Sequence, residues 1–444
     1  MQLEPYQNGR GDKSPHKRRE VAHVTEQAGK RPNLRYVVVA VAVCLMACGT
    51  MGLPNAYGVF YTPMSDALGA GRGAVTMHMS ISNLIIGLFT PIVARSLAHG
   101  HKMRNVLMVA TALVLVSGVA IAFAPNTLIM DVAAVVRGVG FAAVAMFVIT
   151  LYIGNWFQKG RGTITGIALS GSGIGSAIAS PIVTACIERF GYQTAYLGFV
   201  AFTVLTILPV MLFCPLTPEE VGLKPYGADE VDEDEKGAKQ ASDDLGLKLV
   251  LLSPTFVVLV VFVLAIVLIT TLSGHMASLA QDYGYSAQVG ALLLSASMVG
   301  NVVSKFALGA IADKIGAFRA CVCSLVTTFV GLLLILLNLG GQTSLLVSGF
   351  LYGTSFSIGS LGISLLTRYI FGDDQYAEAY STISLVTSLA SAMGVTAAGL
   401  AYDLTGSYAA PIIAGIALVG IAGGCLVYLR WRVTTRPWEK RAQA

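Results

Sequence analysis

Arg137 and Lys305 are the two ionisable side chains that lie well inside long apolar segments of this sequence, and both are cations. No Asp or Glu lies at a comparable depth in any of these segments. A charge near the centre of a bilayer costs on the order of 2.5–3.5 kcal/mol on insertion scales, so such residues persist chiefly where function needs them. Two cations without a carboxylate partner therefore predict an anionic ligand.

Other polar residues could line a site with these two cations. Asn301 precedes Lys305 by four residues, so the two share one face of a helix. Lys305 could instead extend its ammonium group to the lipid headgroups, and Arg137 could make structural hydrogen bonds to a neighbouring helix. For His78 and His275, packing or contact with water is the simpler interpretation. The remaining candidates for substrate binding are His275, Tyr57, Asn55 and Asn83.

Long apolar segments must position all of these residues. The chain is 55% apolar and 12% charged, and a helix of about 20 apolar residues spans the hydrocarbon core of a bilayer. The sequence lacks the period-two alternation that a membrane β-barrel needs. We therefore predict an all-α membrane protein with twelve transmembrane helices. They run over roughly residues 36–61, 74–98, 104–124, 128–154, 162–187, 192–214, 252–280, 288–312, 318–338, 343–370, 377–402 and 408–431.

Lys and Arg gather at both termini and in alternate loops. Eight lie in residues 1–35 and four in residues 432–444, and every second loop between them continues the pattern. Since basic loops stay in the cytoplasm, we expect both termini to be cytoplasmic. The expected location is the plasma membrane, as in the inner membrane of a bacterium. The net charge of +5 is thus a topology signal, and it implies no nucleic-acid partner.

An acidic linker divides the sequence into two related halves. The longest polar interruption, from Pro215 to Leu247, carries ten acids against three Lys. Glu188-Arg-Phe-Gly191 and Asp403-Leu-Thr-Gly406 end corresponding segments of the two halves, 215 residues apart. We therefore expect two pseudo-symmetric six-helix bundles. The expected parts are a cytoplasmic tail at 1–35, bundles at 36–214 and 251–431, an acidic cytoplasmic linker at 215–250 and a second tail at 432–444.

The loop after the eighth apolar segment carries a charged motif. It reads Gly309-Ala-Ile-Ala-Asp313-Lys314-Ile-Gly316-Ala-Phe-Arg319 and resembles the Gly-x-x-x-Asp-Arg/Lys-x-Gly-x-x-Arg signature of the major facilitator superfamily. The resemblance implies a gate, in which Asp313 binds a helix N-terminus or Arg319 and so latches one conformation. Lys314 and Gly316 complete the candidate gating residues. The alternative is an ordinary charged turn.

Five further segments, spread over nearly the whole chain, narrow this resemblance. They are Gly58-Val-Phe60 with Pro63, Trp156-Phe-Gln-Lys159-Gly-Arg161-Gly, Gly166-Ile-Ala-Leu-Ser-Gly171-Ser-Gly173-Ile-Gly175 with Pro181, Pro218-Glu-Glu-Val-Gly222-Leu-Lys-Pro225, and Tyr402-Asp-Leu-Thr-Gly406-Ser-Tyr408. Together they resemble the monocarboxylate transporter and oxalate/formate antiporter branch. In that branch the pair matching Asn301 and Lys305 is Asp and Arg in proton-coupled transporters, and Asn and Arg in antiporters. This chain is similar to the antiporters at Asn301 and departs from both patterns by using Lys.

These features predict a secondary active transporter that moves a small organic anion, most simply a monocarboxylate, by alternating access. It would act as an anion exchanger or as a proton symporter, so a proton or counter-anion is the expected second partner of a monomer in the lipid bilayer. The alternatives are a multidrug or amphiphile exporter of the same fold and a transport-inactive membrane sensor. The seven cysteines lie in apolar segments without His or carboxylate neighbours, so we expect no metal and no cofactor. The sequence shows no arrangement of a nucleophile with a base, so we do not expect an enzyme.

Overall fold

The computed structural model describes residues 34–98, 102–144, 146–158, 161–227 and 253–435. In these ranges the chain is helical, apart from its connections and one isolated bridge between Phe157 and Tyr226. Eleven helices there are long and apolar enough to cross a membrane. The longest, Ile164–Phe213, contains two spans, because Gly191 adopts a left-handed φ of 79° and interrupts the helix. The predicted all-α fold with twelve transmembrane helices is therefore confirmed.

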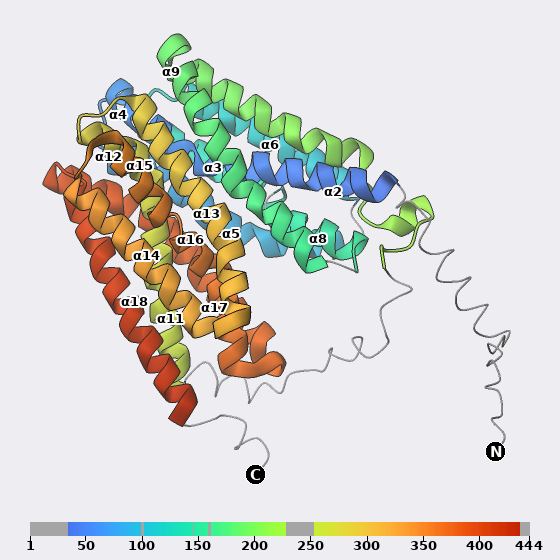
Figure 1. Cartoon of the computed structure of the whole chain (residues 1–444). Helices are drawn as coiled ribbons and strands as arrows, with labels where there is room; N and C mark the ends of the chain where they lie inside the picture. The colour runs from blue at the N-terminus through green and yellow to red at the C-terminus, as the bar shows by residue number, and fades with distance from the viewer. Residues whose placement is uncertain (1–33, 99–101, 145, 159–160, 228–252, 436–444) are drawn as a thin grey trace, which may run out of the picture.

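The first half of the chain begins with a broken span and continues with longer helices (Figure 1). Its elements before the acidic linker are α2 (Leu34–Ala47), the π-turn η1 (Cys48–Gly52), α3 (Leu53–Asn55), the 3₁₀ turn η2 (Tyr57–Phe60), α4 (Tyr61–Leu68), α5 (Arg72–Ala98), α6 (Met103–Ala122), α7 (Thr127–Ala142), α8 (Met146–Trp156), α9 (Arg161–Phe213) and the 3₁₀ turn η3 (Pro218–Val221). Helix α9 holds the fifth and sixth spans, and α7 with α8 forms the fourth.

The second half repeats this plan. Its elements are α11 (Pro254–Thr271), the 3₁₀ turn η5 (Leu272–His275), α12 (Met276–Asp282), α13 (Ala287–Ile315), α14 (Ala317–Leu337), α15 (Gly341–Tyr352), α16 (Ser355–Ser357), the π-turn η6 (Ile358–Gly362), α17 (Ile363–Thr405) and α18 (Ala409–Thr435). The 3₁₀ turns η2 and η5 interrupt the first and seventh spans at positions 215 residues apart. The same offset separates the two sequence motifs noted above, so the break in the helix is part of the internal repeat.

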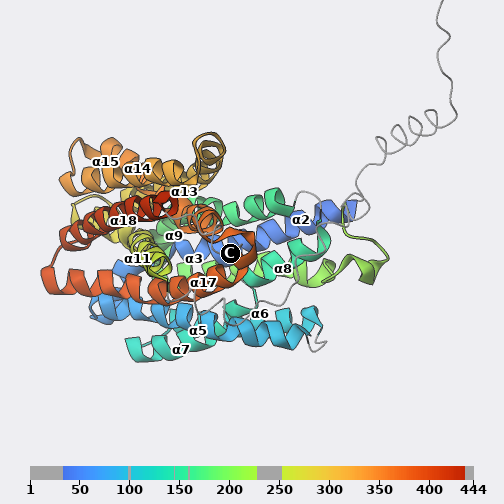
Figure 2. The ribbon, with the colours of Figure 1, turned by 90° about the horizontal axis from the view of Figure 1, so that it is seen from below.

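The two bundles meet at one end of the molecule and diverge towards the other (Figure 1). They meet where α4 ends, α5 begins and α17 ends; we call this the closed end. They diverge towards the beginning of α2 and the end of α18, which we call the open end. Figure 2 shows α5, α6 and α7 on one side of the molecule, with α17 running beside α5.

Close backbone contact joins the bundles at the closed end. A Cβ atom added to Gly58 would lie 2.3 Å from the carbonyl oxygen of Gly274, so only glycine allows this approach. One cluster of buried apolar side chains runs through both bundles there, with Tyr57 and Phe262 among its members. A second cluster lies wholly in the first bundle, near the open end, and includes Trp156. The apolar core of the first bundle near the open end is thus separate from the cluster that the two bundles share.

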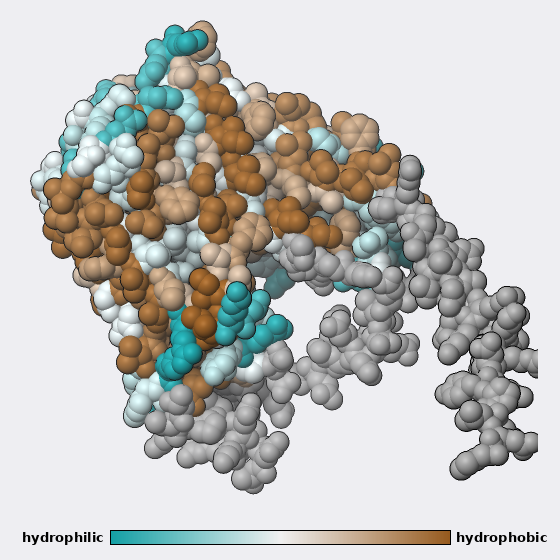
Figure 3. Space-filling model, viewed as in Figure 1, coloured by the Kyte–Doolittle hydropathy of each residue, from teal (hydrophilic) through white to brown (hydrophobic). Residues whose placement is uncertain are grey.

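The outer surface is that of a membrane protein. Figure 3 shows hydrophobic side chains along the sides of both bundles and hydrophilic ones towards the ends. Large apolar residues such as Leu128 and Phe213 are about 70% exposed, which a lipid environment accommodates. The described start of the predicted linker packs on the first bundle, since the Trp156 indole donates a hydrogen bond to the carbonyl of Pro215 (3.0 Å). The predicted tails lie almost wholly, and the acidic run of the linker entirely, outside the described residues.

Candidate functional site

A carboxylate of the second bundle caps a helix of the first bundle at the closed end. Asp403, near the end of α17, accepts hydrogen bonds from the backbone N–H groups of Arg72 (2.9 Å) and Gly73 (2.8 Å) at the start of α5. These N–H groups have no acceptor within their own helix and carry the positive end of its dipole. The guanidinium of Arg72 also lies 4.0 Å from the ring centroid of Tyr402. The Asp403 carboxylate at the start of α5 and the contact between Arg72 and the Tyr402 ring together join α5 to α17.

His275 is part of the same closed end. Its Nε2 lies 2.8 Å from the carbonyl oxygen of Val395, and because a carbonyl only accepts, Nε2 carries the proton. Nδ1 then accepts from the Tyr408 hydroxyl at 3.1 Å, and the Tyr61 ring packs 5.5 Å away. Both ring nitrogens are occupied in this conformation. The structure therefore places this candidate substrate residue in the contact between the bundles.

Arg137 projects from α7 towards α5 in the middle of the first bundle. It is 4% exposed, its Nε donates to the Ser82 hydroxyl (2.9 Å), and its Nη2 lies 2.9 Å from the Met79 sulfur. The guanidinium carbon is 4.9 Å from the ring centroid of Tyr57. Nη1 is buried without a hydrogen-bond partner among the described residues. Since no described carboxylate pairs with it, the cation keeps hydrogen-bonding capacity for a ligand.

Aromatic rings and a second histidine enclose this guanidinium. The Tyr57 ring packs 4.9 Å from Phe199, and its hydroxyl lies 3.5 Å from that of Tyr196. The His78 ring stands perpendicular to Tyr57, with the centroids 6.4 Å apart. His78 Nδ1 contacts the Val75 carbonyl, whereas its Nε2 is buried without a partner among the described residues. This cluster of side chains therefore combines a donor and an imidazole nitrogen that are both unpaired among the described residues.

Lys305 and Asn301 lie on α13, in the second bundle. Lys305 is half-buried and makes no hydrogen bond or ion pair with the residues that the structure describes. Asn301 is 1% exposed, its Nδ2 is 3.9 Å from the Met298 sulfur, and its Oδ1 has no described partner. A Cβ atom added to Gly173 of α9 would lie 3.4 Å from Asn301 Nδ2. Asn301 thus faces the opposite bundle, one helical turn from the free ammonium group.

The two remaining asparagines are less tightly held. Asn55 Nδ2 donates to the carbonyl of Ser172 over 3.4 Å, a long hydrogen bond across two spans of the first bundle. Asn83 is half-buried and follows Ser82, the partner of Arg137. No described hydrogen bond or ring contact joins Arg137 to Lys305. The candidates therefore fall into three groups: a cluster between α5 and α7, a pair on α13 and the residue at the closed end.

The charged motif after α13 lies at the open end. Asp313, Lys314 and Arg319 are exposed, and Asp313 forms no hydrogen bond or ion pair with described residues. Gly316 ends α13 with a φ of 88°, a conformation that favours glycine. Arg319 lines a small cavity with Tyr369, and no described hydrogen bond or ion pair joins it to Asp313. The predicted latch is not formed in this conformation. No group of three or more His, Cys, Asp and Glu is placed to hold a metal in the described ranges.

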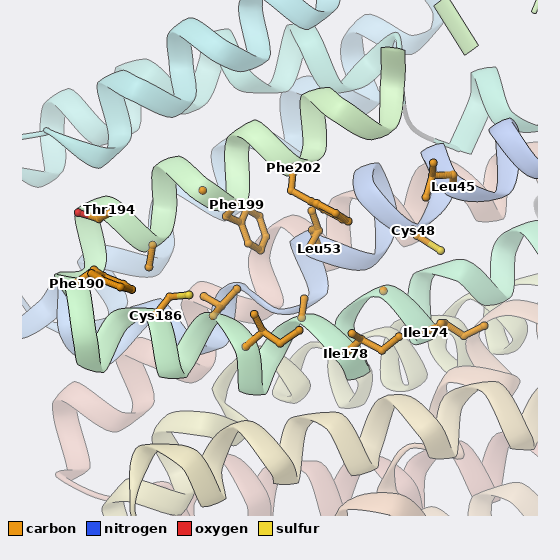
Figure 4. Close-up of a pocket in the computed structure, with 16 residues that line it drawn as sticks. Leu45, Cys48, Leu53, Ile174, Ile178, Cys186, Phe190, Thr194, Phe199 and Phe202 are labelled. Atoms are coloured by element: carbon orange, nitrogen blue, oxygen red, sulfur yellow. The ribbon is translucent and has the colours of Figure 1, made fainter. Parts of the chain in front are cut away.

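A separate apolar groove of about 510 Å³ opens on the side of the first bundle. Figure 4 shows Leu53 and the two arms of α9 around it, with Ile174 and Ile178 on one arm and Phe199 and Phe202 on the other. None of the predicted site residues lines it. Phe199, which lines the groove, packs against the Tyr57 ring, and Tyr57 in turn packs against the Arg137 guanidinium.

The sequence matches the family model of the Major Facilitator Superfamily over residues 38–290 and 262–444. The chain therefore belongs to this superfamily of membrane transporters. It is 26% identical over 311 residues to Monocarboxylate transporter 12 of Rattus norvegicus, an alignment that covers 64% of this chain and 63% of that protein. It is 22% identical over 402 residues to Monocarboxylate transporter 13 of Rattus norvegicus, with 88% of each chain covered.

Among solved structures, the nucleoside transporter NupG has the same fold. The TM-score is 0.68 at 9% sequence identity, over 88% of this chain and 99% of that chain. Such a low identity relates the folds and says nothing of the ligand. The predicted likeness to the monocarboxylate branch rests on the sequence relatives and is confirmed by them.

Three features of the site were not among the predicted functional residues. Asp403 was noted as part of a repeat and of a segment that resembles the monocarboxylate transporter branch, but it was not a candidate functional residue. Tyr196 carries no local pattern that distinguishes it from a packed aromatic residue. His78 was interpreted as packed or in contact with water; it is buried, and one of its ring nitrogens has no partner among the described residues.

Proposed function

We propose that this chain is a secondary active transporter of small organic anions, most simply monocarboxylates, and that it works by alternating access as a monomer. Arg137 of the first bundle and Lys305 of the second neutralise the anion. Asn301, Asn55, Asn83 and Tyr57 supply polar lining. His275 takes part when the closed end opens and frees its ring nitrogens.

The observation that carries this proposal is the unbalanced charge inside the membrane. Arg137 Nη1 has no hydrogen-bond partner, and Lys305 has neither hydrogen bond nor ion pair, among the described residues. An unpaired buried charge is costly. A carboxylate from outside the protein supplies the missing negative charge and the missing acceptors. The names of two relatives, monocarboxylate transporters 12 and 13, agree with this class of cargo.

The arrangement of the bundles supports alternating access with the open end towards the cytoplasm. The basic tails continue from the beginning of α2 and the end of α18, both at the open end, and basic segments favour the cytoplasmic side. The closed end, where Asp403 caps α5, is then the outer gate. The Asp313 motif would latch the opposite gate after the bundles rock.

Ligand-dependent thermal stability tests the proposal directly. A ligand that binds only the folded protein stabilises it by about 2.7 kcal/mol at a concentration of 100 times its Kd. We expect purified protein to be stabilised by at least one of acetate, L-lactate, pyruvate and oxalate, and not by the matching neutral amides. Uptake of the same labelled anion into proteoliposomes should exceed uptake into protein-free vesicles. A panel without any stabilising carboxylate would contradict an anionic cargo.

The apolar groove favours a second candidate function, binding of an amphiphile from the bilayer. Ile178 and Ile182 on its wall are about 60% exposed, so it opens towards lipid. Gly198 also lines it, and a Cβ atom there would meet nothing within 4 Å. Gly198→Leu should therefore fill the groove without a clash. If the cation tetraphenylphosphonium binds wild-type protein and binds this variant more weakly, the result supports an amphiphile exporter. If only carboxylates bind, the exporter interpretation is wrong.

A further inference from the structure

The fold determines the protonation of one ring nitrogen of His78, and the other nitrogen has no partner among the described residues. Nδ1 contacts the carbonyl oxygen of Val75, three residues earlier on α5. Because a carbonyl can only accept, Nδ1 carries the proton of the neutral ring. Nε2 then presents a lone pair, which is buried and has no donor among the described residues. His78 is 1% exposed, so bulk solvent does not reach this ring. A buried acceptor of this kind needs a proton donor.

The unpaired donor of Arg137 lies on the same side of α5. Arg137 Nε is hydrogen-bonded to Ser82, and Ser82 follows His78 by one helical turn on one face of that helix. The Arg137 guanidinium and the His78 ring also pack against the same Tyr57 ring, at 4.9 and 6.4 Å from its centroid. Both are more than nine-tenths buried. One face of α5 thus combines a free N–H donor with a free nitrogen acceptor.

A carboxylic acid group is the complement of this pair. Its carbonyl oxygen accepts and its hydroxyl donates, as Arg137 Nη1 and His78 Nε2 require. We propose, resting on the anion transport proposed above, that these two atoms hold the carboxyl group of the cargo together with one proton. His78 is thereby the coupling residue of a proton symport. No bond within the cargo changes: one carboxylate and one proton bind from water on one side and leave together on the other.

The charges around His78 make the two binding events interdependent. The titratable or charged groups that face it from packed elements are Arg137 of α7, Tyr57 of η2 and, behind Tyr57, Tyr196 of α9. The part of α17 beside it, residues 383–400, contains none. Two positive charges among buried side chains repel each other, so an anion must arrive before His78 holds a second proton. The anion in turn is held better when the proton is present, which is the reciprocity of linkage.

Tyr57 is the side chain that must move when a carboxyl group enters. It lies against both Arg137 and His78, and its hydroxyl contacts the Arg137 guanidinium as well as the Tyr196 hydroxyl, which is 3.5 Å away. The contact between the two hydroxyl groups is long for a hydrogen bond, and a carboxyl group bound to Arg137 would replace the contact that the guanidinium makes with Tyr57. Because η2 is a 3₁₀ turn between two helical pieces, the backbone at Tyr57 is also a natural place for adjustment.

The pH dependence of pyruvate binding tests this inference. Uptake of one proton with each anion makes the apparent Kd rise about tenfold per pH unit as protons become scarce. We expect this slope for detergent-purified wild-type protein between pH 6.5 and 8.5. This range begins about two units above the usual pKa of a carboxyl group, so the free anion is deprotonated throughout. A pH dye in weakly buffered solution should report one proton taken up for each pyruvate bound. Either a flat Kd or no proton uptake would overturn the role of His78.

Two substitutions and one matched control complete the experiment. The amide of His78→Gln reaches the position of Nε2, and that of His78→Asn replaces Nδ1, so each keeps a different polar contact. Whichever variant folds should bind pyruvate with a Kd that no longer depends on pH. Thr90→Val, which removes a hydroxyl bonded to its own helix in α5, should keep the slope. If either histidine variant keeps the pH slope, the inference about His78 is overturned, whereas the proposed anion transport is not. If wild-type protein binds no monocarboxylate, both the proposed function and this inference fail.

Discussion

The Oδ2 atom of Asp403 lies 2.8 Å from the backbone nitrogen of Gly73, so a carboxylate of one bundle caps a helix of the other. The two residues are 330 positions apart in the sequence. The exposed position of Asp403 means that solvent screens this contact. It nevertheless places charge where the first N–H groups of α5 lack acceptors. The closed end can therefore be loosened by a single substitution that leaves both helices intact.

Asp403→Asn should shift the molecule away from the conformation closed at this end. A charge at an exposed helix terminus contributes about 0.3–1 kcal/mol, so the ratio of closed to opened molecules should fall about two- to fivefold. Distances between spin labels at Ala67 and Gln342, on opposite bundles, would report the change. High salt should reduce the difference between wild type and variant.

Glu188→Gln is the matched control for that substitution. Glu188 occupies the position in the first half that corresponds to Asp403, is exposed and caps no helix among the described residues. It should leave the spin-label distances unchanged. Equal effects of the two substitutions would mean that net charge, and not the capping of α5, sets the population.

The orientation of the molecule can be tested at its two ends. In protein without the exposed Cys323, a cysteine at Ala67 marks the closed end and one at Asn105 marks the open end. We expect an impermeant maleimide to label Ala67→Cys in intact cells, and Asn105→Cys only after permeabilisation, because basic segments favour the cytoplasm. The reverse pattern would place the Asp403 contact at the cytoplasmic gate.

Asp313→Asn should lower transport more than it lowers ligand affinity. In the conformation described, Asp313 is exposed and has no described partner, so its loss does not destabilise this state. The predicted latch forms only when the open end closes, and its removal therefore slows the cycle without changing the binding residues. Uptake rates and equilibrium Kd for the same anion measure the two effects. Asp66→Asn, an exposed acid at the closed end, is the control; an unchanged uptake rate in Asp313→Asn would reduce the motif to a charged turn.

The fold could be predicted from the sequence because it depends on local signals. Apolar length specified the spans, and the Glu188-Arg-Phe-Gly191 segment marked the turn at which Gly191 divides α9. The 215-residue offset predicted repeated halves, and the 3₁₀ turns at Tyr57 and Leu272 follow it. Hydropathy is read residue by residue, so these features need no knowledge of distant partners.

The partners of the buried groups could not be predicted in this way. Arg137 was a candidate from its charge and depth alone, but its contact with Ser82 depends on how α7 packs on α5. His275 was a candidate from its polarity, and the fold occupies both of its nitrogens with Val395 and Tyr408. Rotation of a helix about its axis decides which polar atoms stay free, and in spans that are apolar on all sides the sequence pattern does not specify that rotation.

Lys305→Gln should abolish carboxylate transport while leaving most of the protein folded. The ammonium group has no described partner to lose, so its removal should not lower the melting temperature in the absence of ligand. Lys305→Arg should retain part of the activity, since it keeps the charge but presents a larger planar fork. Counterflow of labelled pyruvate in proteoliposomes, normalised to folded protein, measures both. Near wild-type uptake by Lys305→Gln would favour the amphiphile exporter.

Asn301→Asp asks whether the same ammonium group is available for a ligand. A carboxylate one helical turn from Lys305 can pair with it, and it would then compete with the anion for the only cation on this face of α13. Anion exchange should weaken at neutral pH and recover in part as acid protonates the new carboxyl group. Asn301→Ser removes the amide without adding charge and should show no such recovery. If both variants respond to pH alike, Lys305 does not contact the cargo from this face, and Arg137 alone would carry its charge.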